Sequence, residues 1–360
     1  MRILFIVTGV GLGDSIRVNT VIDALKKENP NTNILIAGYA NSYYYFKEKY
    51  STINIAGYSI PGRSMKFRFL PFILRNFILP LYWLFIAFKL KKAVKMFKPD
   101  IVISDFEPTG VVLAKLVNKK CVMLFGFNPL LYKQFKAENK VGAIMALQAK
   151  YLEKNYDLGN FVIVPTLLGV KRKTLIYTFV NPITRTKLKD LPAERTLMKK
   201  LGFKKKPILV MLGGSNFGIK LLKKLKSIAH EYPDEIFIVF GTKNLVEPLP
   251  NLLHYIYKEN VLEYMKIAKF VITLGGEVTL SEAVTFKKPM LIYPIKNHVE
   301  QMLNAYSLKN VAMVGKDVKT LRDDLNNFIK NLDSYQKKMS KLKIESNGAE
   351  QVVKIIKNLV

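Results

Sequence analysis

The stretch at residues 269–305, KFVITLGGEVTLSEAVTFKKPMLIYPIKNHVEQMLNA, decides the fold class. Its FVITL run is short, apolar and β-branched, which predicts a buried strand. The glycine pair Gly275 and Gly276 then permits a tight turn, and we expect Thr279 or Ser281 to cap the helix that follows. The LIY run predicts a second buried strand. Strand, glycine turn, helix and strand in this order are typical of a parallel α/β sheet.

The polar residues of this stretch suit a nucleotide sugar. In an open α/β sheet, ligands bind at the carboxyl ends of the strands, and a helix N-terminus there favours phosphate. Glu282, in the first turns of the helix, can accept two hydrogen bonds from a ribose diol. Gln301 can donate and accept, as recognition of sugar hydroxyls requires. His298, three residues earlier, is a further candidate for contact with sugar or phosphate.

The spacing Gly276-x-x-Thr279-x-x-Glu282, followed by Gln301-x-x-Asn-Ala, resembles the donor-site signature of GT-B glycosyltransferases. It is most similar to family 28, which includes the peptidoglycan N-acetylglucosaminyltransferase. The resemblance implies an α/β GT-B fold, with two Rossmann-like domains facing across a cleft. It also implies that Glu282 binds the ribose and Gln301 the donor sugar. Relatives often carry His or Arg at the position of Leu274, so backbone N–H groups would bind more of the phosphate here.

The resemblance also divides the chain of 360 residues. Residues 1–178 would form an acceptor- and membrane-binding domain, and residues 179–335 a nucleotide-sugar-binding domain. Residues 336–360 would form a helical tail that crosses back to the first domain.

Further donor contacts follow from the same resemblance. Arg185 ends a segment similar to the family's G-N-P-x-R, with Val180 in place of the glycine, and would contact the donor phosphate; alternatively it is a plain linker cation. A G-G-S loop would cradle the diphosphate, and Leu262 would line a uracil pocket. The remaining donor-site candidates are Gly13, Gly213, Gly214, Ser215, Gly275 and Gly276.

The N-terminus predicts a strand at residues 3–7 and a glycine loop that ends in Gly13-Asp14. Its G-x-G-x-G spacing, and the lack of an acidic residue after the second strand, disfavour an NAD site. The loop resembles that of GT-B enzymes, in which Gly-His supplies the proposed acceptor base. Asp14 is therefore our candidate base, although an ordinary Asp pKa of about 3.9 requires burial or an acidic neighbour to raise it. Alternatively, Asp14 is only a helix N-cap.

Asp105 and Glu107 follow another predicted strand and should lie at the same sheet edge as Asp14. Either could orient the base or replace it; alternatively, they only solubilise a loop. The sequence holds no D-x-D triplet, and the resemblance implies catalysis without a metal or other cofactor.

Residues 63–98 hold nine Lys and Arg and no acid, together with the run FLPFILRNFILPLYWLFIAF. Arg75 and Pro80 interrupt this run, so we do not expect it to span a bilayer. Aromatic residues flanked by cations are typical of a segment that lies in a membrane interface. The alternative is a core helix pair with basic outer faces. The candidate membrane residues are Arg75, Phe77, Trp83, Phe85, Lys89, Lys91 and Lys92.

Composition restricts the partners and the compartment. A formal net charge of +30 implies an anionic partner, either nucleic acid, a phospholipid surface or a phosphate-bearing substrate. The aromatic residues concentrate in one apolar stretch rather than alternating with cations, so we expect no nucleic acid. The single cysteine, Cys121, fits a reducing compartment. The apolar run at the N-terminus is too short for a signal peptide. We therefore expect a cytoplasmic protein, peripheral on the inner membrane face.

Together these features predict an inverting, metal-independent glycosyltransferase. It would move a sugar, GlcNAc or another hexose, from a UDP-sugar to a polyprenyl- or other lipid-linked acceptor. Two alternatives remain open at this point. One is an enzyme similar to the GT-B-fold UDP-GlcNAc 2-epimerases, and the other is a non-catalytic binder of anionic surfaces or nucleic acid.

Overall fold

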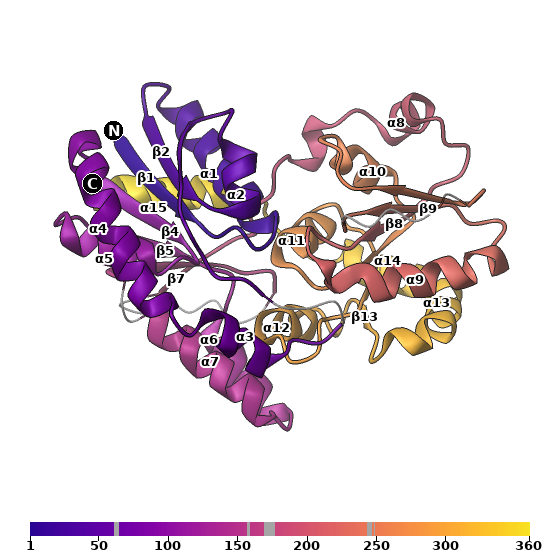
Figure 1. The fold of residues 1–360 in the computed structure, drawn as a ribbon. Helices are drawn as coiled ribbons and strands as arrows, with labels where there is room; N and C mark the ends of the chain where they lie inside the picture. The colour runs from indigo at the N-terminus through magenta and orange to yellow at the C-terminus, as the bar shows by residue number, and fades with distance from the viewer. Residues whose placement is uncertain (61–64, 157–158, 169–176, 243–246, 248) are drawn as a thin grey trace. The chain divides into compact units, whose positions relative to one another are not determined.

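The computed structural model describes residues 1–360 except 61–64, 157–158, 169–176, 243–246 and 248. The chain forms two compact units (Figure 1). The first comprises Met1–Pro61, Arg68–Ile183 and Asn347–Val360, and the second comprises Gly62–Phe67 and Thr184–Ser346. The change of unit after Ile183 falls later than the expected 178/179. The return to the first unit at Asn347 falls later than the expected start of the tail at residue 336.

The first unit contains a parallel sheet with the strand order β3-β2-β1-β4-β5-β6-β7. Its core strands are short apolar runs because both faces of a parallel sheet are covered by helices. Among the described residues the strands are β1 (Arg2–Val7), β2 (Asn33–Gly38), β3 (Ser51–Asn54), β4 (Ile101–Asp105), β5 (Cys121–Leu124), β6 (Phe161–Pro165) and β7 (Tyr177–Val180). The expected strand at residues 3–7 is present as β1.

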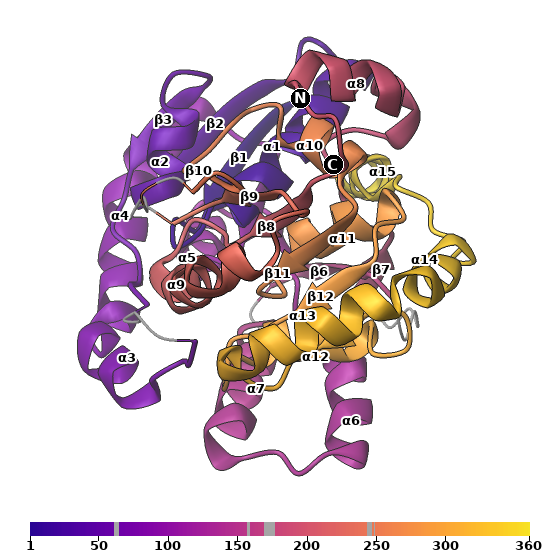
Figure 2. The ribbon, with the colours of Figure 1, turned by 90° about the vertical axis from the view of Figure 1, so that its right-hand side faces the viewer.

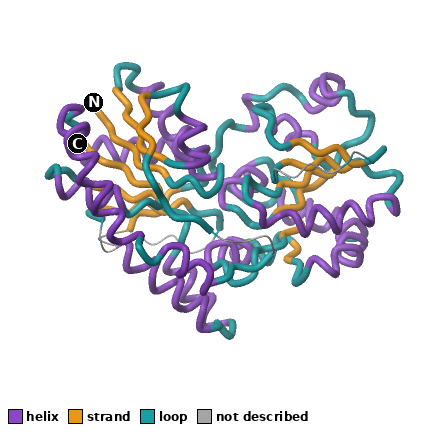
Figure 3. The backbone as a smooth tube through the Cα atoms, in the orientation of Figure 1, coloured by secondary structure: helices purple, strands orange, loops and turns teal. Residues whose placement is uncertain are grey.

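Helices cover this sheet and extend beyond it. They are α1 (Gly13–Glu28), α2 (Ala40–Phe46), α3 (Phe69–Asn76), α4 (Leu79–Phe97), α5 (Thr109–Leu116), α6 (Pro129–Glu138), α7 (Ala143–Tyr156) and α15 (Gly348–Leu359). Figure 3 shows the helices as purple tubes on the faces of the orange strands.

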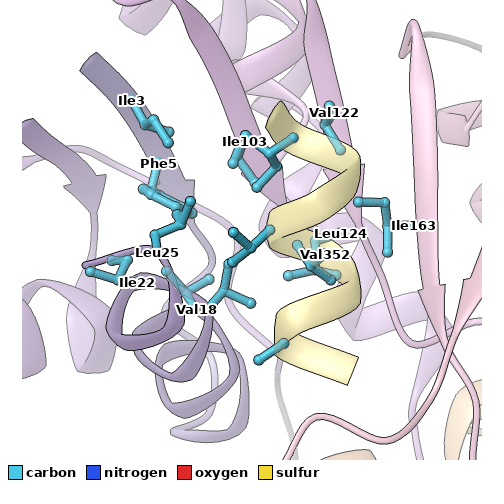
Figure 4. Packing of buried hydrophobic residues seen from close by; sticks show 14 of the residues in the cluster. Ile3, Phe5, Val18, Ile22, Leu25, Ile103, Val122, Leu124, Ile163 and Val352 are labelled. Atoms are coloured by element: carbon cyan, nitrogen blue, oxygen red, sulfur yellow. The ribbon is translucent and has the colours of Figure 1, made fainter. Parts of the chain in front are cut away.

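The C-terminal helix α15 completes the core of the first unit. Its apolar residues Val352, Val353 and Ile356 pack with the buried face of α1 and with the central strands. Figure 4 shows Val352 close to Leu124, a residue that lies more than two hundred positions earlier in the chain. Burial of this apolar stripe is what holds the chain end on the first unit.

The second unit repeats the architecture with a smaller sheet of order β10-β9-β8-β11-β12-β13, again parallel. Its described strands are β8 (Ile208–Met211), β9 (Phe237–Phe240), β10 (Leu252–Tyr255), β11 (Phe270–Thr273), β12 (Met290–Ile292) and β13 (Met313–Val314). Its helices are α8 (Glu194–Leu201), α9 (Ile219–Ile228), α10 (Val261–Ile267), α11 (Glu277–Thr285), α12 (Val299–Ser307), α13 (Leu321–Lys330) and α14 (Leu332–Ser340). Figure 2 shows this unit, in which α9 packs against α13 and α11 against α12.

Strand β7 extends the first sheet by pairing with β6 through Val162↔Tyr177 and its neighbours. One local expectation was wrong. Thr279 and Ser281 do not cap the helix after the glycine pair. That helix begins at Glu277, its N-cap is Gly276, and no side chain accepts a capping hydrogen bond there. Backbone N–H groups at the start of α11 therefore lack a side-chain cap.

The segment at 63–98 forms α3 and α4, and Arg63 lies outside the described residues. One face of α4, with Ile86, Leu90 and Val94, is buried, and the helix lies beside α5 (Figure 1). Helix α3, the turn that follows it and the rest of α4 leave large apolar side chains exposed. They are Leu70, Ile73, Leu74, Phe77, Ile78, Leu81, Tyr82, Leu84, Phe85 and Phe88, which we call the α3–α4 apolar surface.

This surface does not amount to a single membrane span. In the described part of the chain, no single helix is long and apolar enough to cross a membrane. Helices α3 and α4 pass that test of length and composition only as a pair, and a bend of 41° separates them.

Candidate active site

Both sheets reverse their strand order at one point, and the predicted site residues gather there. In the first unit the reversal lies between β1 and β4, and in the second it lies between β8 and β11. A parallel sheet leaves an opening at the carboxyl ends of such a strand pair, because the two crossovers run to opposite sides.

In the first unit the glycine loop follows β1 and lies against the start of α2. A Cβ on Gly9 would come within 1.7 Å of the Tyr39 carbonyl oxygen, so only glycine fits there. Asn41 donates from its backbone N–H to the Gly9 carbonyl at 3.2 Å and from its side chain to the Val10 carbonyl at 3.3 Å. These contacts fix the loop that leads to Asp14.

Arg17 connects the two acidic positions that the sequence placed at this edge. Its Nε and Nη2 donate to the two carboxylate oxygens of Asp105 at 2.9 and 2.6 Å, and Nη2 also donates to Asp14 at 2.7 Å. Arg17 and Asp105 are buried, whereas the Asp14 side chain keeps 27% exposure. The structure therefore brings Asp14 and Asp105 together through an arginine that sequence reasoning missed. The sequence did hold a signal for Arg17: it follows Asp14 by three residues, a spacing that places both side chains on the same side of a helix.

Asp14 is not the N-cap of α1. The N-cap is Leu12, and Asp14 lies in the first turn of the helix. Burial raises the pKa of Asp14, and the neighbouring Arg17 opposes this rise. Asp105 is less suited to proton transfer, because Arg17 binds both of its oxygens in the interior.

Glu107 lies beneath the same edge and is fully buried. Its Oε1 accepts a hydrogen bond from the Thr109 hydroxyl at 2.9 Å, and its Oε2 has no hydrogen-bond partner among the described residues. Burial raises the pKa of Glu107 to about 7. The preceding residue, Phe106, adopts φ 51°, a left-handed conformation that is uncommon outside glycine. Glu107 thus differs from the solvated loop acid that was one of the alternatives.

In the second unit the G-G-S loop follows β8 at the reversal point. Gly213 has φ 68°, and its carbonyl accepts a hydrogen bond from Thr242 N–H at 3.0 Å. A Cβ on Gly241 would lie 2.3 Å from the Gly213 carbonyl oxygen, so the loops after β8 and β9 can approach only through glycine. Gly214 and Ser215 follow, and Ser215 is the N-cap of a short 3₁₀ helix.

Arg185 and Glu282 form one bidentate ion pair in the second unit. Arg185 Nε and Nη2 donate to the two Glu282 carboxylate oxygens at 2.6 and 2.8 Å. The Glu282 side chain is 1% exposed and that of Arg185 is 18% exposed. From the sequence, we expected Glu282 to bind the ribose and Arg185 to contact the donor phosphate. It could not show that they contact each other, because they are distant in the chain.

The start of α11 lies next to β11 at this edge. Gly275 has φ 94°, which the turn after the strand requires. Gly276 has open space where a Cβ would stand, Thr279 is half-buried, and Leu274 is buried. Glu277, another residue missed from the sequence, is buried in the first turn and accepts a hydrogen bond from Ser281 at 2.7 Å.

Gln301, His298 and Asn304 lie on or just before α12. His298 is the N-cap of the helix, and its Nδ1 accepts from the Gln301 backbone N–H at 3.5 Å. Desolvation lowers the pKa of His298 to about 4, so the ring is neutral near pH 7. Gln301 Oε1 accepts from Ile295 N–H at 3.2 Å, and Asn304 donates to the Gly275 carbonyl at 3.1 Å. His298 therefore has a structural function as a cap.

Leu262, expected to line a base pocket, is a buried residue in the first turn of α10. Near it, Lys258 lies over the Tyr255 ring at 3.7 Å and donates to the Tyr264 hydroxyl at 3.1 Å. The sequence did not indicate this lysine–tyrosine group.

No group of three or more His, Cys, Asp or Glu side chains among the described residues is arranged to hold a metal ion. The expectation that transfer needs no metal stays a prediction.

Comparisons with known proteins identify the family. A family model described as glycosyl transferase family 1 matches residues 1–333. Over 308 residues the chain is 31% identical to a UDP-N-acetylglucosamine–N-acetylmuramyl-(pentapeptide) pyrophosphoryl-undecaprenol N-acetylglucosamine transferase of Clostridium botulinum, which covers 79% of this chain and 81% of that protein.

Solved structures agree in fold. The glycotransferase of kitacinnamycin matches with a TM-score of 0.67 at 14% identity, covering 100% of this chain and 98% of that one. MurG of Acinetobacter baumannii matches with a TM-score of 0.60 at 15% identity, covering 99% and 100%. The chain belongs to the glycosyl transferase family 1 and is a glycosyltransferase with the two-domain GT-B fold. The expected resemblance and fold class are confirmed.

The Arg185–Glu282 pair should support the folded state of the second unit. Arg185→Met leaves a carboxylate buried without its guanidinium, and we expect a loss of about 3–5 kcal/mol in the free energy of unfolding. Adding Glu282→Gln should restore most of this loss. Lys205→Ala, which removes an exposed pair with Asp234, is the control and should leave stability close to that of wild type. Urea unfolding measures all four proteins, and equal effects of Arg185→Met and Lys205→Ala would show that the buried pair does not stabilise the second unit.

Glu107 should make stability fall as the pH rises. Its pKa is about 7 in the folded chain against a reference value of 4.5, so between these values the folded state binds more protons than the unfolded state. The contribution is therefore full below pH 4.5 and is lost as the pH rises through 7, by about 3 kcal/mol in total. We expect Glu107→Gln to remove this pH dependence, measured as the difference in unfolding free energy between variant and wild type at pH 5 and pH 8. A difference that does not change with pH would show that Glu107 is ionised in the folded state.

Proposed function

We propose that this glycosyltransferase transfers GlcNAc, with inversion, from UDP-GlcNAc to a lipid-linked acceptor that carries N-acetylmuramyl-pentapeptide on a polyprenyl diphosphate. The acceptor and donor are those in the name of the Clostridium botulinum relative. The observation that carries the proposal is the second unit's sheet edge, where Glu282, Arg185 and Gln301 occur with two glycine turns. Such an edge suits a nucleotide sugar.

The side chains proposed to bind the donor already have partners within the second unit, and these partners limit which of their atoms the donor would contact. Glu282 has four acceptor positions as a carboxylate, and Arg185 takes two of them. Because the Glu282 side chain is 1% exposed, a local shift would have to open the other two to the ribose hydroxyls. Gln301 uses Oε1 on Ile295, so its amide Nε2 would donate to the donor sugar. The uncapped start of α11, with the Gly213–Gly214 turn, would bind the diphosphate through backbone N–H groups.

The transfer step would be a displacement at the anomeric carbon. The acceptor hydroxyl oxygen forms a bond to C1 of GlcNAc, the bond from C1 to the diphosphate oxygen breaks, and UDP leaves with that electron pair. Asp14 accepts the hydroxyl proton, because it is the one acid of Asp14, Asp105 and Glu107 whose side chain is partly exposed. Arg17, held by Asp105, fixes the Asp14 carboxylate in position. We propose that this chemistry needs no metal.

The α3–α4 apolar surface would bind the cytoplasmic face of an anionic membrane. Phe77 and Phe85 are 72% and 61% exposed, beside the basic residues Arg75, Lys89 and Lys92. Exposed apolar area of this extent is costly in water, and the cations complement anionic lipid head groups. Trp83 is excluded from this surface, because it is half-buried and its Nε1 is enclosed.

Transfer and proton removal can be tested together. We expect the purified chain to convert UDP-GlcNAc and a polyprenyl-diphosphate N-acetylmuramyl-pentapeptide to the disaccharide product, with a β-linkage by NMR. Asp14→Asn should lower kcat by about 10²–10⁴-fold, the usual contribution of a general base, while calorimetry finds UDP affinity unchanged.

The control variant is Asp23→Asn, an acid on α1 outside the proposed site, and it should keep wild-type kcat. An Asp14→Asn enzyme with full activity would remove Asp14 from the mechanism. Formation of a 2-epimerised UDP-sugar without any acceptor would replace the transferase proposal by the epimerase alternative. Product formation that stops with EDTA would contradict metal independence.

Membrane binding is tested by flotation with vesicles of phosphatidylglycerol. Phe77→Ser with Phe85→Ser removes two exposed rings, each worth about 1.5–3 kcal/mol when buried, so binding should fall at least about tenfold. Tyr44→Ser on α2, 67% exposed, is the matched control and should float like wild type. Rising salt should weaken wild-type flotation. Normal flotation of the double variant would show that this surface does not contact lipid.

A further inference from the structure

A short segment from the first part of the sequence belongs to the second unit. Residues 65–67 pair in parallel with the loop between β12 and α12, through the bridge Lys66↔Lys296. Lys296 donates its N–H to the Met65 carbonyl at 3.0 Å, and Phe67 donates its N–H to the Lys296 carbonyl at 2.8 Å. Met65 and Phe67 are buried, and Lys66 between them is exposed. The alternation is that of a strand with one face on a core.

The buried face of this segment contacts the cap of α12. The Phe67 ring lies edge-on to the His298 ring, with centroids 6.2 Å apart and an interplanar angle of 82°. His298 Nδ1 accepts the hydrogen bond from the Gln301 N–H at the start of the helix. Met302 also donates its N–H to the His298 carbonyl at 3.0 Å. Phe67 thus contacts the residue whose side chain accepts the hydrogen bond from the Gln301 N–H.

Gln301 has little freedom in this arrangement. Its side chain accepts from Ile295, which lies one residue before Lys296, the partner of residues 65–67. A Cβ on Gly275 would lie 3.3 Å from the Gln301 carbonyl oxygen, so the glycine turn after β11 packs closely on this residue. A shift of the β12–α12 loop would therefore move Gln301 and disturb its contact with Gly275.

We propose that Phe67 is a positioning residue of the donor site. It holds the His298 ring as the cap of α12 and so fixes Gln301 for the donor sugar. This inference rests on the proposed function, because it needs a nucleotide sugar at the edge of the second unit. It assigns to the donor site a residue that lies in the first fifth of the sequence, more than two hundred positions before the donor motif.

The test compares Phe67→Ala with Phe67→Leu and with Phe72→Ala. Phe72 lies in the next helix and contacts Tyr58 in the first unit, so its removal is the matched control. Loss of a helix cap weakens an interaction by about 1 kcal/mol, so we expect Phe67→Ala to raise the Kd for UDP-GlcNAc and the donor KM roughly five- to tenfold. The value of kcat at saturating donor should stay at the wild-type level. Phe67→Leu should recover most of the donor affinity, and Phe72→Ala should not change it.

A second readout does not depend on the nucleotide. In Phe67→Ala we expect faster amide hydrogen exchange at Gln301 and Met302, while β11 stays protected as in wild type. Unchanged exchange together with unchanged donor affinity would overturn the proposal. Loss of protection in β11 would also overturn it, because Phe67 would then support the whole unit rather than the cap. If wild type binds no UDP-GlcNAc, the proposed donor fails, and exchange at Gln301 alone decides whether Phe67 positions that residue.

Discussion

A parallel sheet places the carboxyl ends of all its strands at one edge, and the reversal of strand order opens that edge at one point. The rest of this structure depends on that constraint. Between β1 and β4 it brings the N-terminal glycine loop next to Asp105, and between β8 and β11 it brings the Gly213 turn next to the Gly275 turn. Burying polar groups inside a sheet costs free energy. At this edge they can be accommodated, because loop backbones and helix N-termini offer them hydrogen bonds.

At each of these edges an arginine neutralises a buried carboxylate. Arg17 binds both oxygens of Asp105, and Arg185 binds both oxygens of Glu282. A buried charge is tolerated only when it is paired and hydrogen-bonded, so both arginines are constrained as strongly as the acids they hold. The two pairs differ in one respect. Arg17 also reaches the partly exposed Asp14, which links a buried ion pair to a group that solvent and substrate can reach.

The segment between β3 and α4 divides between the two units, because residues 62–67 belong to the second. Asn76 at the end of α3 binds the Ser59 backbone with both ends of its amide: Oδ1 accepts from the Ser59 N–H and Nδ2 donates to the Ser59 carbonyl, at 2.9 Å each. Tyr58 lies edge-on to Phe72 and to Phe106. Residues 65–67 pair with the second unit, and α3 begins at Phe69 with the apolar surface. Along the chain, the segment that contacts the α12 cap is therefore followed directly by the helix at which the surface proposed for lipid begins.

The sequence by itself determined the strands with continuous apolar runs, the glycine turns and the α/β class, because these depend on local backbone freedom and on side chains that must be buried on both faces. It also determined that Asp14, Asp105 and Gln301 lie near strand ends or helix starts, since order along the chain fixes which end of a parallel strand a residue follows. Aromatic residues flanked by cations also predicted a segment at the surface, and the rings of Phe77 and Phe85 are exposed.

The tertiary structure alone decided which of these groups contact each other. The Arg185–Glu282 pair, the Arg17–Asp105 pair and the contact of Phe67 with His298 join residues that are 97, 88 and more than two hundred positions apart. Local pattern carries no information on such pairs. The same holds for β7, which is a strand because it pairs with β6. The return of the C-terminal tail to the first domain, in contrast, was expected from the resemblance, and α15 packs there. Burial and pairing energies act between segments that meet only in the folded chain, so the contacts between the site residues could be established only from the tertiary structure.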